Sequence, residues 1–182
     1  MFVFYGPSGS GQDAVIEGIK KVLPLELTIT TSTRKMRAGE SEGKPYYFIS
    51  EKSFREGIAE GRFIEYAQTY NDDFYGLTRK EFERVRNSGK IGIWRTDFQG
   101  AHTARKLYPD LKIIFINAPL DILERRIRRR DNPSEEYLEK RLDYIKKWLP
   151  KVIYDYKVEN EEGKLSETIA KVAAIIKEAK LS

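Results

Sequence analysis

The sequence predicts an α/β protein built on a doubly wound parallel sheet. Three short runs, residues 2–5, 91–94 and 112–117, are continuously apolar rather than alternating, which is typical of strands covered on both faces. Segments with apolar residues at helical spacing separate these runs along the chain. Strands that alternate with helices form a parallel sheet with helices on both sides, and ligands of such sheets bind at the carboxyl ends of the strands.

The first part of the chain predicts a strand, a helix, a second strand and an insertion. "FVFY" (2–5) is the first strand, and "LTIT" (27–30) is the second. A helix begins at about Gly11 between them, with helical spacing of Val15, Ile16, Ile19, Val22 and Leu23. Residues 31–78 are polar, aromatic and rich in turn residues, so they predict a small antiparallel insertion.

The second part predicts alternating helices and strands. Helices are expected at 99–108, 119–130 and 134–148, with Ser134 capping the last of them. "VIYDYKVEN" supplies a final strand. A closing amphipathic helix is indicated by Leu165, Ile169, Val172 and Ile176.

The composition fits one domain of a soluble, cytoplasmic protein. The chain has 182 residues, 40% of them hydrophobic and 34% charged, which is enough to bury a core. It contains no apolar run of bilayer length, and a strand-like segment opens it where a signal peptide would stand. The absence of Cys excludes disulfides and thiol chemistry.

The charge balance indicates a phosphate-rich partner. The formal net charge is +5, and "RRIRRR" (125–130) concentrates basic side chains in one place. A free nucleotide and a nucleic-acid backbone both fit this surplus. The aromatic residues are not interleaved with the basic run as a base-stacking surface requires, which argues against nucleic acid.

The glycine-rich segment after the first strand resembles a P-loop, which reads G-x-x-x-x-G-K-[ST]. "GPSGSG" (6–11) fits the first six places, but Gln12 replaces the lysine and Asp13 replaces the hydroxyl residue that helps to hold Mg²⁺. An ordinary tight turn is the alternative. The candidate phosphate-binding residues are Gly6, Ser8, Gly9, Ser10, Gly11, Gln12 and Asp13, with Asp13 as the candidate Mg²⁺ ligand.

From end to end the chain resembles a guanylate kinase. The resemblance rests on "TTSTRKMRAGESEGKPYYF", "FIEYAQ" followed by "FYG", "TDFQGA", "LERRIRRRDNPSEEYLEKRL" and "YDYKVEN", in the family's order and at nearly its spacing. It implies a P-loop fold with a core (1–30, 79–121 and 146–182), a GMP-binding insertion (31–78) and a helical lid (122–145). The implied reaction is phosphoryl transfer from ATP to GMP, giving GDP and ADP, with Mg²⁺ bound to ATP.

The resemblance assigns a GMP phosphate clamp to Arg34, Arg37, Tyr46 and Tyr75. Guanidinium groups match phosphate oxygens bidentately, and phenols add neutral donors. A purely solvated loop is the other interpretation of the two arginines.

The guanine base is assigned to Glu65, Thr30 and Asp97. A carboxylate can accept from the ring N–H and the amine of guanine together, whereas adenine lacks that pair of donors. Asp97 has an alternative role as a helix cap. The family has Ser or Thr after its Tyr-Gly pair, but this chain has Leu77, and Thr78 is the candidate substitute.

The lid of the family supplies arginines to the transferred phosphate, which correspond here to Arg126, Arg130 and Arg141. A solvated helix face is the alternative for such a charge run. Together with Arg34 and Arg95, these arginines form the candidate catalytic set.

Arg95 replaces the first aspartate of the family's Asp-x-Asp pair, so three departures coincide in one small volume. Lys, Ser/Thr and Asp sum to zero formal charge, and so do Gln12, Asp13 and Arg95. One hypothesis is an exchange of roles, in which Arg95 supplies the lost cation and Asp13 the lost magnesium ligand. The alternatives are a GMP-binding pseudokinase, where Asp13 only neutralises Arg95, and a protein-interaction module. His102 is expected on the surface, and Trp94 and Trp148 in the core or at a contact between subdomains.

Overall fold

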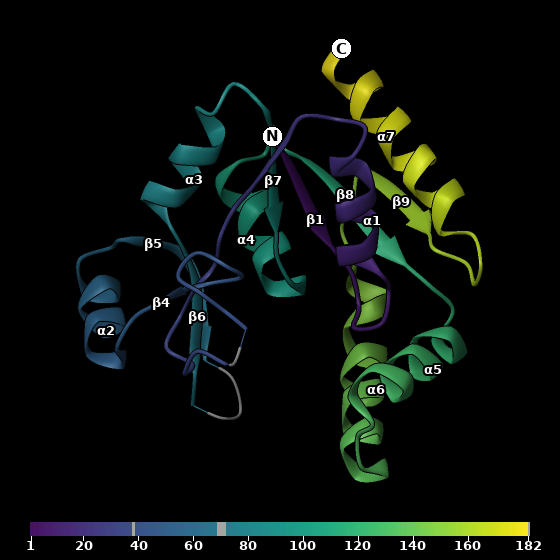
Figure 1. Ribbon diagram of the computed structural model, residues 1–182, viewed down its shortest axis with the longest axis horizontal. Helices are drawn as coiled ribbons and strands as arrows, with labels where there is room; N and C mark the ends of the chain where they lie inside the picture. Colours follow the sequence, from purple (N-terminus) through teal and green to yellow (C-terminus); the bar gives the residue numbers. More distant parts are fainter. Residues whose placement is uncertain (38, 69–71, 182) are drawn as a thin grey trace. The chain divides into compact units, whose positions relative to one another are not determined.

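A computed structural model describes residues 1–37, 39–68 and 72–181, and shows an α/β architecture (Figure 1). Ala38 and residues 69–71, which fall within the predicted insertion, lie outside the described residues. The elements, in order, are β1 (Phe2–Tyr5), α1 (Gln12–Lys20), β2 (Leu25–Leu27), β3 (Thr31–Ser32), β4 (Tyr47–Phe48), α2 (Glu51–Ala59), β5 (Phe63–Gln68), β6 (Phe74–Thr78), α3 (Arg79–Arg86), β7 (Ile91–Arg95), α4 (Phe98–Leu107), β8 (Lys112–Asn117), α5 (Leu120–Asp131), α6 (Glu135–Trp148), the 3₁₀ helix η1 (Leu149–Lys151), β9 (Tyr156–Glu159) and α7 (Leu165–Leu181).

The larger sheet has the strand order β2-β7-β1-β8-β9. β8 pairs in parallel with both β1 and β9. All four residues of β1 are buried, as the continuous apolar run predicts. The expected fold class is therefore confirmed.

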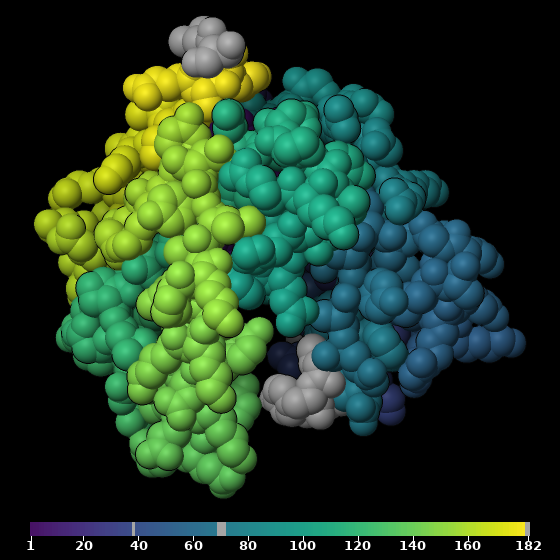
Figure 2. Space-filling view, turned by 180° about the vertical axis from the view of Figure 1, so that it is seen from behind, coloured from purple at the N-terminus to yellow at the C-terminus, as the bar shows by residue number. Residues whose placement is uncertain are grey.

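The chain divides into two compact units, which we call unit 1 (residues 1–25 and 95–182) and unit 2 (residues 26–94). Residues 26–30 and 79–94, which the sequence places in the core, group with the predicted insertion in unit 2. In unit 1, α1 and α7 lie side by side, and α5 pairs with α6 (Figure 1). α6 forms a continuous strip of the surface in Figure 2, and its exposed charges pair along the helix, as between Lys140 and Glu136.

Unit 2 contains a four-stranded sheet with the order β4-β3-β6-β5. β6 pairs antiparallel with β3 and β5, as expected for the insertion, but β3 and β4 are parallel. α2 packs Phe54 against Phe63 and Phe74, and these three rings form the unit's core. Trp94 is buried against Phe82, as predicted.

Two local predictions are wrong. The second strand spans Leu25–Leu27 rather than 27–30. Thr28 N–H still donates to the Ile93 carbonyl of the neighbouring β7, but Ile29 N–H donates to the Glu81 side chain instead of a strand. Val22 is 60% exposed, because α1 ends at Lys20 and Val22 lies beyond the helix.

Tyr5, the last residue of β1, fixes the start of the glycine-rich loop. Its ring is fully buried, and its hydroxyl donates to the Ile153 carbonyl (2.8 Å) and accepts from the Ile153 amide (3.0 Å). Burial raises the pKa of Tyr5 to about 12, so the phenol stays protonated and can donate. Trp148 packs on Phe98 beside this ring, which confirms its place in the core.

We expect Tyr5→Phe to destabilise the protein by about 1–3 kcal/mol, because both backbone groups of Ile153 lose a buried partner. Urea unfolding measures this change. Tyr154→Phe is the control, since that ring is half exposed. An unchanged midpoint for Tyr5→Phe contradicts this account.

Candidate phosphate and nucleotide site

The glycine-rich loop bends sharply between β1 and α1. Ser10 N–H donates to the Pro7 carbonyl (3.0 Å), which closes the turn. A side chain on Gly6 would collide with the Ile116 carbonyl, so only glycine fits there. Gly11 precedes α1 with φ of 82°, and no side chain caps the helix. The uncapped amides at this helix end can bind an anion.

A cavity of about 640 Å³ surrounds this loop. Its size is that of an ordinary small-molecule site. It is lined by the loop residues 6–14 and by Arg126, Arg129, Arg130 and Arg141 from the α5–α6 segment. Amide donors and cationic side chains thus face one space within unit 1, which suits a polyphosphate.

Arg126 holds the loop from its carbonyl side. Its guanidinium donates to the carbonyls of Gly9 (3.3 Å) and Asn160 (3.1 Å) and to the Glu162 carboxylate (3.1 Å). Asn160 adds a bond from its amide to the Ser10 carbonyl (2.8 Å). The structure therefore uses Arg126 to shape the loop, whereas the resemblance assigns it to phosphate.

Arg130 and Arg141 share one carboxylate, that of Asp131. Arg130 binds it bidentately (2.7 and 2.8 Å), and Arg141 reaches its Oδ2 at 3.0 Å. The guanidinium of Arg130, assisted by Arg141, holds the pKa of Asp131 below its usual value. Arg130 also donates to the Ser8 hydroxyl (3.3 Å). Asp131 thus occupies the two arginines in the way that a phosphate oxygen would.

We expect Asp131→Asn to tighten ATP binding roughly threefold, because the neutral amide competes less strongly for the two arginines. Titration calorimetry measures this change. Asp121→Asn is the matched control, because Asp121 pairs with the exposed Arg125 on the same helix and does not line the cavity. Unchanged or weaker binding by Asp131→Asn counts against the competition.

Asp13 and Arg95 form an ion pair, although 82 residues separate them in the sequence. Arg95 Nη1 lies 2.6 Å from Asp13 Oδ1 at the carboxyl end of β7. The Asp13 side chain is 71% exposed and lines the cavity. Gln12 is turned back onto β1, where its amide donates to the Phe4 carbonyl (2.9 Å). Arg95 thus stands beside the loop, and the Gln12 amide is engaged with the strand.

The candidate GMP clamp lies in unit 2. The rings of Tyr46 and Tyr75 meet edge to face at 5.6 Å, and the Arg34 guanidinium lies over Tyr46 at 5.4 Å. Glu40 binds Arg34 bidentately (3.1 and 2.8 Å) and accepts from the Arg37 amide (2.7 Å). Glu40 therefore orders the loop that carries both arginines.

The base-reading candidates lie on the β5–β6 pair. Glu65 pairs with Leu77, and Ala67 pairs with Tyr75, so Glu65, Leu77 and Tyr75 share one face of the sheet. Leu77 is buried. Thr78 turns to the other face, and its hydroxyl caps α3 by accepting from Glu81 N–H (3.2 Å). The Thr78 hydroxyl is thus engaged as a helix cap, on the face of the sheet opposite to Leu77.

Two other candidates, Thr30 and Asp97, and the surface residue His102 make local contacts. Thr30 precedes β3, and its carbonyl accepts from the Tyr47 amide (3.0 Å). Asp97 caps α4 by accepting from Gly100 N–H (2.8 Å), as the alternative interpretation predicts. His102 is exposed and contacts the Lys151 carbonyl.

Two residues of the site were missed by sequence reasoning. Arg129 lines the cavity, and its helical spacing from Arg126 is the signal that could have identified it. Asn160 is buried and bridges the loop to Thr168 of α7, where its amide oxygen accepts from the Thr168 hydroxyl (3.2 Å). Nothing local to Asn160 in the sequence indicates this long-range bond.

Within residues 1–37, 39–68 and 72–181, no three His, Asp or Glu side chains gather as a metal site. Among the same residues, none of the helices has the length and apolar character needed to cross a bilayer.

A parallel sheet, a glycine-rich loop after β1 and an uncapped helix end facing a cationic cavity define the P-loop class of nucleotide-binding folds. Residues 1–179 match the family model described as guanylate kinase. The chain belongs to the guanylate kinase family, so the resemblance is confirmed.

Named relatives and a solved structure support the same family. The guanylate kinase of Photorhabdus laumondii is 34% identical over 186 aligned residues, covering 100% of this chain and 88% of that protein. That of Buchnera aphidicola is 39% identical over 79% of this chain and 70% of that protein. The crystal structure of guanylate kinase from Anaplasma phagocytophilum has a TM-score of 0.73 and 27% identity, covering 100% of this chain and 86% of that one. These relatives carry the name of a phosphotransferase.

Proposed function

We propose that this protein transfers the terminal phosphoryl group of ATP to GMP, giving GDP and ADP. The observation that carries the proposal is the cavity of about 640 Å³ in unit 1, where loop amides and arginines face one another. The clamp residues of unit 2 would hold the acceptor. We further propose a cytoplasmic protein with free nucleotides, rather than nucleic acid, as its ligands.

The donor triphosphate would be held by the loop and the helix end. Amides of the glycine-rich loop bind the β- and γ-phosphates. Arg130 and Arg141 release the Asp131 carboxylate and bind phosphate oxygens in its place. Arg126 keeps the loop in shape through its bonds to carbonyls, and it also lines the cavity that would hold the phosphates.

Arg95 and Asp13 would replace the missing parts of the motif. Arg95, beside the loop at the end of β7, supplies the cation that a lysine provides in the usual motif. Asp13 would hold Mg²⁺, because this ion needs only one or two protein carboxylates together with substrate phosphates, and the Asp13 side chain is exposed at the cavity. When bound, Mg²⁺ neutralises charge that develops on the phosphates.

The acceptor would be positioned rather than activated by a base. An oxygen of the ionised GMP phosphate attacks the γ-phosphorus, and the bond from that phosphorus to the β–γ bridging oxygen breaks. Arg34, Arg37, Tyr46 and Tyr75 orient the acceptor phosphate by donated hydrogen bonds. Glu65 and Thr30 would read the guanine edge, while the Asp97 side chain caps α4.

A GMP-binding pseudokinase is the second candidate, and the Asp13–Arg95 ion pair favours it too. In that case the 2.6 Å contact satisfies both charges, and a carboxylate at the loop repels triphosphate. The combined change Gln12→Lys, Asp13→Ser and Arg95→Asp discriminates the two. If the natural protein shows no transfer while this triple variant transfers phosphate rapidly, the protein is a pseudokinase.

The proposed function is tested by a coupled phosphoryl-transfer assay with GMP and ATP, beside a calorimetric titration of each nucleotide alone. We expect transfer that requires Mg²⁺ and both nucleotides. GMP binding without transfer supports the second candidate. A protein that binds neither nucleotide contradicts both and leaves the interaction module.

A further inference from the structure

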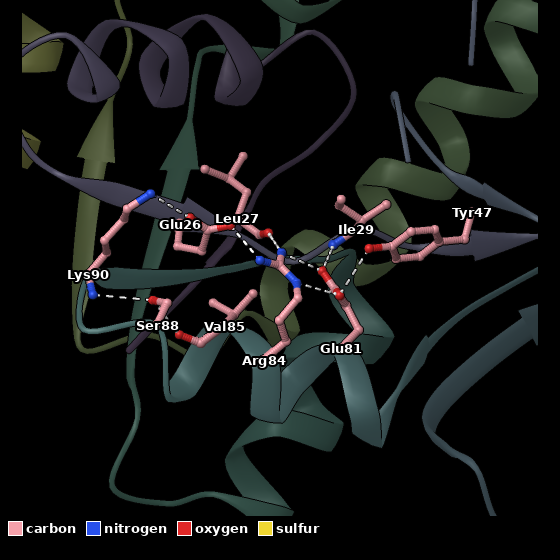
Figure 3. Close-up of polar contacts among 9 residues, drawn as sticks. All are labelled: Glu26, Leu27, Ile29, Tyr47, Glu81, Arg84, Val85, Ser88 and Lys90. Carbon is pink, nitrogen blue, oxygen red and sulfur yellow. Dashed lines mark hydrogen bonds and ion pairs between the residues drawn. The ribbon is translucent and has the colours of Figure 1, made fainter. Parts of the chain in front are cut away.

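A buried carboxylate in unit 2, that of Glu81 on α3, contacts two segments that are distant in the sequence (Figure 3). Its Oε1 accepts from Ile29 N–H at 2.8 Å, and its Oε2 accepts from the Tyr47 hydroxyl at 3.4 Å. Burial, and then the Glu81 charge, raise the pKa of Tyr47, so the phenol stays protonated as a donor. Only 4% of Glu81 is exposed, so its contacts are largely shielded from water.

Arg84, one turn further along α3, compensates the buried charge. It binds Glu81 bidentately through Nε (2.8 Å) and Nη2 (2.9 Å), and the same Nη2 donates to the Leu27 carbonyl (3.1 Å). Glu26 accepts from Arg84 (2.6 Å) and from Lys90 (3.0 Å). Figure 3 shows this chain of polar contacts running from Lys90 to Tyr47.

The two residues that Glu81 contacts outside α3, Ile29 and Tyr47, are neighbours of candidate GMP ligands. Ile29 immediately precedes Thr30, and Tyr47 immediately follows Tyr46. Neighbouring side chains of an extended segment point to opposite faces. Accordingly Tyr47 faces Glu81, whereas Tyr46 meets Tyr75 in the clamp. The Tyr47 amide also donates to the Thr30 carbonyl (3.0 Å), which joins the two segments.

We propose that Glu81 is a positioning residue for GMP, which sets the place of Thr30 and Tyr46 through Ile29 and Tyr47. Arg84 is its counterion and fixes the same segment at Leu27. The inference rests on the proposed function, since it assigns Thr30 and Tyr46 to GMP. None of the residues in this network lines the cavity in unit 1, so Glu81 acts on the acceptor nucleotide alone.

Glu81→Gln is the decisive variant. The amide keeps the shape of the side chain, but its NH₂ group faces the donors of Arg84 or Ile29, so one charge-assisted bond is lost. We expect the Kd for GMP to rise about tenfold, the effect of one such bond. The Kd for ATP stays unchanged. In the coupled assay, KM for GMP rises more than kcat falls.

Two variants of α3 are matched controls. Glu83→Gln makes the same chemical change at an exposed position, where Asn87 donates to the carboxylate at 3.5 Å. Val85→Ala removes a fully buried side chain, so it lowers the melting temperature without touching the carboxylate. Both should keep the GMP affinity of the natural protein. A GMP affinity that follows melting temperature across the three variants overturns the positioning role.

Amide hydrogen exchange tests the same role without a ligand. Glu81→Gln should speed exchange at Ile29 while the amides of the β5–β6 pair keep their protection. If exchange at Ile29 speeds up but the natural protein binds no GMP, the proposed function is refuted, whereas the role of Glu81 in fixing this segment is supported. An unchanged GMP affinity in Glu81→Gln, in a natural protein that does bind GMP, refutes the inference itself.

Discussion

Arg95→Ala is expected to lower the kcat/KM of phosphoryl transfer by on the order of 10²–10³, the usual effect of losing one group that stabilises developing charge. Arg95 Nη1 lies 2.6 Å from Asp13, and the Gln12 amide bonds to the Phe4 carbonyl. Without Arg95, the Asp13 carboxylate would therefore face the triphosphate uncompensated. Steady-state kinetics with ATP and GMP, and titration of ATP alone, measure the loss.

Arg105→Ala is the matched control for this variant. Arg105 forms an ion pair of the same length (2.6 Å) with Asp155 in unit 1, but its partner Asp155 does not line the cavity, whereas Asp13, the partner of Arg95, does. Its removal should leave transfer unchanged. Full transfer by Arg95→Ala would reject Arg95 as the replacement cation.

Glu65→Gln is expected to reduce the preference for GMP over AMP by at least about tenfold, because a site built to hydrogen-bond a substrate group discriminates through that bond. An ionised carboxylate accepts hydrogen bonds from both guanine donors. The amide of Gln accepts only one of them, because its NH₂ group faces the other guanine donor. Competition titrations with GMP and AMP measure the preference. Glu65 shares its sheet face with Tyr75, so binding of the phosphate end is retained.

Glu51→Gln is the control, because Glu51 is exposed on α2 and pairs with Arg55. It should keep the nucleotide preference of the natural protein. Equal affinity of the natural protein for GMP and AMP contradicts guanine reading by Glu65.

Much of the fold is predictable because its core strands carry their own signal. β1 and β8 are continuous apolar runs, and Ser134 caps α6 as its position in the sequence indicates. α2 and α3 lack this clarity, because they are short, highly charged and bury few residues. Their hydroxyl caps, Ser50 and Thr78, are the signals that sequence reasoning passed over.

The site is predictable where a local motif specifies it. It is less predictable where carboxylates and carbonyls of the protein compete with a ligand for the same cations. The glycine spacing locates the loop, and the proximity of Arg95 to Asp13 is confirmed by their ion pair, while their roles stay predictions. The engagement of Arg126 with carbonyls and the hold of Asp131 on two arginines depend on tertiary geometry. A charge run alone does not indicate which cations are already occupied.

The exchange of roles between Asp13 and Arg95 is tested most directly by a double-mutant cycle. Asp13→Ala, Arg95→Ala and the double variant are compared with the natural protein through the kcat/KM of transfer, converted to free energies of transition-state stabilisation. Two residues that act as one phosphate and magnesium site should show a coupling of about 2 kcal/mol, within the range found for residues in contact. A coupling energy near zero, with additive single effects, would contradict the exchange.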